Sequence, residues 1–124
     1  METKKRVLIV DDEPDIVDLV QKILEKNGCV MCSASNGDEA LEKVESEKPD
    51  LILLDVIMPG KTGLEICKIL KSQQKTRSIP VVMFTVLGRE IDKEYARQAG
   101  ADGFLGKPFN MDDLISEVKK SLGA

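Results

Sequence analysis

The chain has 124 residues, a length that favours a single domain, and 42% of them are hydrophobic, enough to bury a core. Its 18 basic and 22 acidic side chains leave a net charge of −4, and only three phenylalanines and one tyrosine are present, so neither a basic nucleic-acid surface nor a base-stacking platform is expected. Because the sequence contains no histidine, Ser-His-Asp catalysis, Cys-His catalysis and histidine metal ligands are excluded.

The first predicted elements are a strand, a helix and a second, weaker strand. Val7–Val10 is a continuous apolar run, which is typical of a strand that is buried on both faces. An apolar stripe with helical spacing follows, with Pro14 in its first turn and Gly28 at its end. Residues 29–34 form a weaker strand signal, and Asn36 begins a pattern that resembles a capping box, so a second helix is expected after it.

The middle of the chain repeats this alternation with clearer signals. Leu51–Leu54 and Val81–Phe84 are continuous apolar runs and are predicted to be the third and fourth strands. Between them, Thr62 and Glu65 have the spacing of a capping box, and an apolar stripe comes next. A third helix is therefore predicted between these two strands.

The last part of the chain completes the pattern. A weaker helix is predicted over residues 89–99, a short strand over residues 103–106, and a final helix after the capping residue Asn110. The final helix has acids in its first turn and lysines in its last turn, which suits the helix dipole. Five strands that alternate with five helices predict an α/β fold, a parallel sheet with helices on both faces.

Polar side chains are expected to gather at one edge of this sheet. The residues directly beyond the strand ends are Asp11, Asp12, Asp55, Thr85 and Lys107, and ligands of open parallel sheets bind at that edge. A single acid there is ordinarily a turn former or a helix cap, but three carboxylates on adjacent strands would repel one another by roughly 10 kcal/mol in total. The cluster therefore predicts a bound Mg²⁺ ion, with the lysine and the threonine as donors to an anion.

Four segments carry a family resemblance that covers essentially the whole chain. Val7–Glu13, Leu54–Gly63, Phe84-Thr85 and Lys107–Phe109 together resemble the receiver domain of two-component response regulators. The resemblance implies a flavodoxin-like, doubly wound sheet of five parallel strands in the order 2-1-3-4-5, with five helices. It also implies that residues 1–124 form one receiver domain.

The resemblance assigns a metal and a phosphorylation site to four residues. Asp55 would be the phosphoryl-accepting nucleophile. Asp12 and Asp55 would bind Mg²⁺ directly, Asp11 would act largely through water, and the backbone carbonyl of Ile57 would supply a further ligand. The cofactor that the resemblance implies is therefore Mg²⁺.

Three other positions match the family's remaining functional residues. Thr85 and Lys107 would contact the phosphoryl oxygens and complete the catalytic set with Asp55. Phe104 matches the aromatic switch position, and its coupling to Thr85 would be steric because phenylalanine has no hydroxyl group. The peptide bond between Lys107 and Pro108 is expected to be cis in this family.

The function implied by the resemblance is phosphoryl transfer in two-component signalling. The domain would take its phosphoryl group from a partner sensor histidine kinase or a phosphotransfer protein, and it would catalyse only its own phosphorylation and dephosphorylation rather than act as an enzyme. Because the chain ends at Ala124, just after the last helix, no output domain is expected within it. The downstream target would be a separate protein or an output domain of a longer regulator.

Two other functional interpretations were weighed for the segment after the third strand. Gly60-Lys61-Thr62 nearly completes a P-loop, but Asp55 stands where the first glycine belongs and Pro59 removes a backbone N–H. A phosphatase of the haloacid dehalogenase type needs a second acid two residues after its nucleophile, and that position is Ile57. Both alternatives are therefore disfavoured.

The cysteine spacing indicates whether a redox motif is present, and the lengths of the apolar runs indicate whether the protein spans a membrane. Cys29 and Cys32 have the spacing of a redox or zinc motif, but on a strand they would point to opposite faces, so ordinary packing is expected. No apolar run approaches the 18 residues of a membrane span, and no export signal precedes the first strand. We therefore expect a cytoplasmic protein without a membrane partner.

Overall fold

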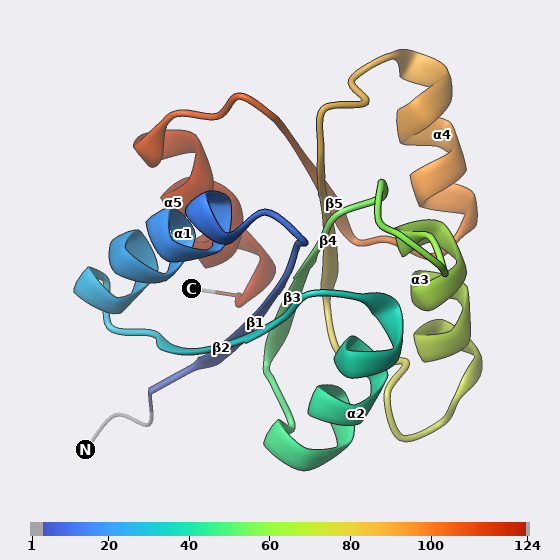
Figure 1. Cartoon of the computed structure of the whole chain (residues 1–124), viewed down its shortest axis with the longest axis horizontal. Coiled ribbons are helices and arrows are strands. Elements are labelled where there is room, and N and C mark those ends of the chain that lie inside the picture. Colours follow the sequence, from blue (N-terminus) through green and yellow to red (C-terminus); the bar gives the residue numbers. More distant parts are fainter. Residues whose placement is uncertain (1–3, 124) are drawn as a thin grey trace.

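The computed structural model describes residues 4–123, and in this range five strands alternate with five helices (Figure 1). In chain order they are β1 (Arg6–Val10), α1 (Pro14–Lys26), β2 (Val30–Ala34), α2 (Gly37–Glu47), β3 (Leu51–Leu54), α3 (Gly63–Ser72), β4 (Val81–Thr85), α4 (Glu90–Gln98), β5 (Gly103–Gly106) and α5 (Met111–Ser121). All strand pairs are parallel, and the sheet order is β2-β1-β3-β4-β5. The predicted fold class and strand order are confirmed.

The helices cover the two faces of the sheet unequally. Figure 1 shows α1 and α5 on one side and α2, α3 and α4 on the other. Each side has its own hydrophobic core, one containing Leu24 and Val118 and the other containing Ile66 and Leu70. The three central strands are buried on both faces, which explains why their sequences are continuous apolar runs.

Most helix starts follow the predicted capping chemistry. Thr62 and Glu65 form a reciprocal capping box, and the Asn110 side chain accepts a hydrogen bond from the Asp113 N–H at 2.8 Å. Asn36 differs, because its side chain accepts from the Glu39 N–H at 2.9 Å but the Glu39 carboxylate accepts from the Ser35 hydroxyl at 3.2 Å. The second helix is therefore capped by Asn36 alone, without the reciprocal half of the box.

Several boundaries differ slightly from the sequence-based ranges. The second strand begins at Val30 because the Cys29 N–H is used in the turn that ends α1, where it donates to the Leu24 carbonyl. The fourth strand extends to Thr85, which is paired with Gly106 of β5. No helix within residues 4–123 is both long enough and apolar enough to cross a membrane.

The strand register aligns the polar residues at the carboxyl edge of the sheet. Val10 of β1 is paired with Leu54 of β3, and the Asp55 N–H donates to the Val10 carbonyl at 3.0 Å. The residues that follow, Asp11 and Asp55, therefore leave the sheet side by side. On the other side, the Lys107 N–H donates to the Thr85 carbonyl at 2.8 Å, so the lysine emerges directly beyond the threonine.

Candidate functional site

Three carboxylates meet where the strand order reverses between β1 and β3. Each of Asp11, Asp12 and Asp55 offers a carboxylate oxygen, and these oxygens all lie within 4.8 Å of one another. Asp11 and Asp55 are buried, with 1% and 4% of their surface exposed, whereas Asp12 is exposed. Among residues 4–123 no other group of acids and thiols lies close enough to share a metal ion. The predicted acid cluster is therefore present in the structure.

Lys107 lies inside this cluster. Its Nζ atom is 2.5 Å from Asp11 Oδ2, 3.2 Å from Asp55 Oδ2 and 3.9 Å from Glu13 Oε1. It also lies 4.9 Å from the centre of the Phe84 ring, and its side chain is only 7% exposed. The sequence argument counted three uncompensated negative charges, and one ammonium group within the cluster reduces that repulsion substantially. A metal ion is therefore not required to hold the strand ends together.

The surroundings of Asp55 and Lys107 shift the pKa values of these two groups. Burial raises the pKa of Asp55, and this effect outweighs the Ile57 N–H and the Lys107 charge, both of which lower it. Burial alone would lower the pKa of Lys107, but its hydrogen bond to Asp11 and the charges of both aspartates raise the pKa overall. At neutral pH the lysine is therefore held as a cation beside two buried acids.

The backbone around Asp55 orients its side chain. The Ile57 N–H donates to Asp55 Oδ1 at 3.1 Å, while Lys107 takes the other oxygen. Gly63, the first residue of α3, packs directly on this segment, and a Cβ atom there would lie 2.8 Å from the carbonyl carbon of Asp55. A glycine at this position therefore lets the helix start close against the end of the strand.

A cavity of about 240 Å³ opens over the acids. It is lined by residues of the sequence prediction and by two others: Asp12, Glu13, Asp55, Ile57, Val86 and Lys107. Ile57 and Val86 are 52% and 62% exposed, so the rim of the cavity is apolar. Sequence reasoning did not assign a role to Glu13, although its place directly after the two aspartates is the signal that could have identified it.

Thr85 and Phe104 are not part of the lining of this cavity. Thr85 is fully buried, and its hydroxyl oxygen accepts a hydrogen bond from the Leu87 N–H at 3.3 Å. Phe104 is paired with Met83 of β4, and strand alternation places Met83 and Thr85 on one face of that strand. The half-buried Phe104 ring lies 5.9 Å from the Nζ atom of Lys93 on α4. The proposed switch pair therefore shares the sheet face that α4 covers.

The structure also shows where the residues of the near P-loop and of the Cys29–Cys32 motif lie. Lys61, the lysine of the near P-loop, forms an ion pair with Asp38 at 2.9 Å instead of joining the acid cluster. Cys29 packs against the core beneath α1 and α5, whereas Cys32 packs against the opposite core, so their side chains lie on opposite faces. All three thiols are free. The peptide bond between Lys107 and Pro108 is cis, as the resemblance implied.

A buried lysine bridges two acids at the switch point of this sheet. Comparisons with known proteins identify the class of signalling domain to which this fold and site belong. The sequence profile of the response regulator receiver domain matches residues 7–119. The chain is 44% identical over 118 residues to the alkaline phosphatase synthesis transcriptional regulatory protein PhoP of Bacillus subtilis (strain 168). It is 41% identical over 115 residues to the phosphate regulon transcriptional regulatory protein PhoB of Klebsiella pneumoniae.

These alignments cover 95% and 93% of this chain but 48% and 50% of the two proteins, so the chain spans about half the length of the curated relatives it matches. A crystal structure of the chemotaxis protein CheY4 of Vibrio cholerae has a TM-score of 0.91 and 33% identity, and covers 96% of this chain and 99% of that one. The chain belongs to the response regulator receiver family, whose members accept phosphoryl groups in two-component signalling. Receiver domains are not enzymes in the ordinary sense, and their partners are histidine kinases or phosphotransfer proteins.

Proposed function

We propose that Asp55 is the residue of this receiver that accepts the phosphoryl group. The observation that carries the proposal is the position of its carboxylate, which is held between the Ile57 N–H and the Lys107 ammonium group and faces the cavity. Asp11 has matching partners, the Glu13 N–H and Lys107, but does not line the cavity, whereas Asp12 lines the cavity but makes no side-chain hydrogen bond within residues 4–123. Asp55 is therefore the oriented acid that also reaches the cavity.

The proposed reaction is transfer from a phosphohistidine of a partner kinase. The P–N bond to the partner's imidazole breaks, and a P–O bond to the Asp55 carboxylate forms. Lys107 and Thr85 are proposed to contact the transferred oxygens, because the lysine lies in the cavity and the threonine hydroxyl lies at the same sheet edge. The catalytic contribution of these residues is positioning and charge compensation.

The acid cluster fits the implied Mg²⁺ ion. Asp11, Asp12 and Asp55 supply only hard oxygen donors within 4.8 Å of one another, and with Lys107 present the cluster still has an excess of negative charge. The Ile57 carbonyl is proposed as a further ligand, because its residue lines the same cavity. When bound, the ion would compensate the negative charge of the phosphoryl oxygens.

The proposed output is a shift between two arrangements of β4, β5 and α4. A movement of Thr85 toward a phosphoryl oxygen would leave space for the Phe104 ring on the same sheet face. The residues that we propose as the switch are therefore Thr85 and Phe104. The downstream target is a separate protein or another part of a longer regulator.

We also propose the extent of the domain and its compartment. Residues 1–124 form one receiver domain, a proposal supported by the single sheet and by the family match over residues 7–119. The cytoplasm is the proposed compartment, because the three thiols are free and the partners are kinases or phosphotransfer proteins. Neither a nucleic acid nor a membrane is proposed as a partner of this domain.

Intact mass spectrometry after incubation with acetyl phosphate and Mg²⁺ tests the proposal. The wild-type protein should gain one phosphoryl group, Asp55→Asn should gain none, and Asp18→Asn, which changes an exposed aspartate of α1, should behave like the wild type. A phosphorylated Asp55→Asn protein would show that another residue is the acceptor. A generic phosphoester should not be hydrolysed, in contrast to a phosphatase.

A further inference from the structure

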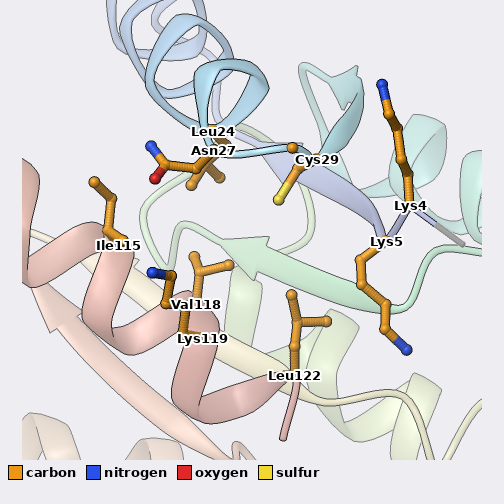
Figure 2. Close-up of a pocket in the computed structure, with 10 residues that line it drawn as sticks. Lys4, Lys5, Leu24, Asn27, Cys29, Ile115, Val118, Lys119 and Leu122 are labelled. Atoms are coloured by element: carbon orange, nitrogen blue, oxygen red, sulfur yellow. The ribbon is translucent and has the colours of Figure 1, made fainter. Parts of the chain in front are cut away.

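A second cavity lies at the opposite edge of the sheet from the acid cluster. Its volume is about 440 Å³, and it is bounded by the end of α1, the end of α5 and the residues before β1 (Figure 2). Because the strands are parallel, this position is at their amino ends, where none of the proposed phosphorylation residues lies. We call it the basic pocket for the charges described below.

The floor of the basic pocket is apolar. Leu24 and Val118 are 1% and 2% exposed overall, and the partly buried Ile115 and Leu122 extend the apolar surface. Figure 2 shows the side chains of Leu24, Val118 and Leu122 and the sulfur atom of Cys29 turned toward the same space. The volume falls within the range of pockets that hold small molecules, roughly 300–1,000 Å³.

Within the described part of the chain, the rim of the basic pocket carries positive charge only. Lys4, Lys5 and Lys119 are part of its lining, and no acid of residues 4–123 lines it. None of these three lysines forms an ion pair with an acid of residues 4–123, and what sets them apart from the other unpaired lysines is that they surround one cavity. In a chain with a net charge of −4, three cations without an acidic partner among residues 4–123 around one apolar cavity are a local reversal of charge.

We propose that the basic pocket binds a small amphipathic anion. The apolar body of this ligand would lie on Leu24, Val118 and Leu122, and its carboxylate or phosphate would be attracted by Lys5 and Lys119. An apolar ligand without charge would leave the lysines without a partner, and a cationic ligand would be repelled by them. The lysines therefore favour a negatively charged ligand, and the apolar floor favours a ligand with an apolar body.

A titration followed by methyl and amide NMR spectra tests the ligand class. The probes are decanoate, decyl phosphate, decanol and decyltrimethylammonium at concentrations below micelle formation, so that the apolar chain is constant and the head group varies. Decanoate or decyl phosphate should shift the resonances of Leu24, Cys29, Val118 and Leu122, and their comparison identifies the preferred head group. No shifts, or equal binding of the neutral and cationic probes, would overturn the proposal.

Two neighbouring lysines of α5 provide a matched pair of variants. Lys119 lines the pocket and Lys120 does not, and both lie in the last turn of the helix. Lys119→Gln should weaken decanoate binding roughly two- to fivefold, and Lys5→Gln with Lys119→Gln roughly tenfold, whereas Lys120→Gln should leave it unchanged. Equal effects of the two single variants would show unspecific attraction to the surface and would overturn the proposal.

Alkylation of the thiols provides a measurement that does not depend on charge substitutions. Decanoate should slow the reaction of Cys29 with a small maleimide and leave that of Cys32 unchanged, because Cys32 packs on the opposite face of the sheet. Sedimentation of the same samples tests the competing occupant, a second copy of this chain. Dimerisation that protects Cys29 without any probe would replace the proposed ligand with a protein interface.

Discussion

Two lysines with largely buried side chains lie at opposite edges of the sheet. The partners that compensate their buried ammonium groups differ. Lys107 is 7% exposed, and its close partners are the carboxylates of Asp11 and Asp55. Lys71 is 17% exposed and pairs with Asp102 at 2.7 Å, but it also donates to the backbone carbonyls of Arg77 at 3.1 Å and Ile79 at 2.8 Å. One lysine has only charged side chains as partners, and the other is bound mainly by fixed backbone.

This difference separates a functional cation from a structural one. The carbonyl partners of Lys71 belong to the loop between α3 and β4, so the lysine holds that loop in place. The partners of Lys107 are the acids that we propose as metal ligands and as the phosphoryl acceptor, so in this proposal the lysine exchanges one anion for another. We therefore expect substitution of Lys71 to change stability and substitution of Lys107 to change chemistry.

The largest effect is expected for Lys107→Met. Loss of the ammonium group removes compensation for the phosphoryl charge, so phosphorylation by acetyl phosphate should slow at least about 100-fold. Intact mass measured over time gives the rate, with Lys71→Met as the control that should be phosphorylated at nearly the wild-type rate when folded. A rate within threefold of wild type for Lys107→Met would remove the proposed distinction between the two lysines.

The second effect concerns stability at the other edge of the sheet. Lys71→Met removes the donor to two carbonyls and leaves the Asp102 carboxylate with the Val81 N–H as its hydrogen-bond donor, and the expected loss is about 2 kcal/mol in the free energy of unfolding, because the site is partly exposed. Urea denaturation should show a lower midpoint that Mg²⁺ does not restore. The midpoint of Lys107→Met should rise with Mg²⁺, since a cation would then replace the missing charge. If Mg²⁺ restores both variants equally, the two sites are not distinct.

The third effect concerns the lifetime of the phosphoryl group that we propose on Asp55, beside Lys107. Ile57 and Leu87 stand two positions after Asp55 and Thr85, and neither can orient an attacking water molecule by hydrogen bonding. A variant with Ile57→Asn and Leu87→Glu should lose phosphate at least about tenfold faster, a difference of ~1.4 kcal/mol in the barrier. Phosphate release after removal of the donor gives both rates. A wild-type protein as fast as the double variant would show that Ile57 and Leu87 do not protect the phosphorylated state.

The smallest effect follows from the raised pKa of Asp55. Burial favours the protonated carboxyl group, so ionisation of Asp55 reduces the stability of the folded state as the pH rises above the ordinary value of 3.8. Asp55→Asn should therefore be more stable than the wild type at pH 7 without metal, by a few degrees in Tm, since about 1 kcal/mol corresponds to roughly 4 °C or more. The difference should vanish below that pH. A wild-type protein that is more stable than the variant at neutral pH would contradict this interpretation.

The sequence contains enough information to place the backbone, because the apolar runs and the caps are local signals. Leu51–Leu54 and Val81–Phe84 could be predicted as buried strands from their own residues, and Asn36 and Thr62 mark the helix starts correctly. The missing half of the Asn36 capping box could not be predicted, because it depends on whether the Glu39 carboxylate turns to Ser35 or to the backbone. Such a choice between two nearby donors is made by side-chain rotamers, which sequence periodicity does not describe.

The clustering of the acids and the lysine was predictable from the sequence, but their internal pairing was not. The strand ends bring Asp11, Asp55 and Lys107 to one edge, as the spacing indicates. The sequence argument treated the acids as mutually repelling and the lysine as a donor to an external anion, whereas the lysine pairs with the acids themselves. Which of two roles a lysine takes depends on distances between chain segments far apart in sequence. Glu13 was not given a role, although its place beside the two aspartates is visible in the sequence, because its proximity to Lys107 is a contact across the fold.

The close packing of Gly63 against Asp55 has a consequence for how this sequence can change over time. Gly60, in the same loop, has a φ of +78° but open space around it, so residues that tolerate a left-handed backbone, such as asparagine, remain acceptable there. At Gly63 the obstacle is space, because any Cβ atom would meet the Asp55 carbonyl group. In a library that varies both positions, several residues should survive at position 60 and only glycine at position 63, so the two glycines of one loop are under different evolutionary constraints.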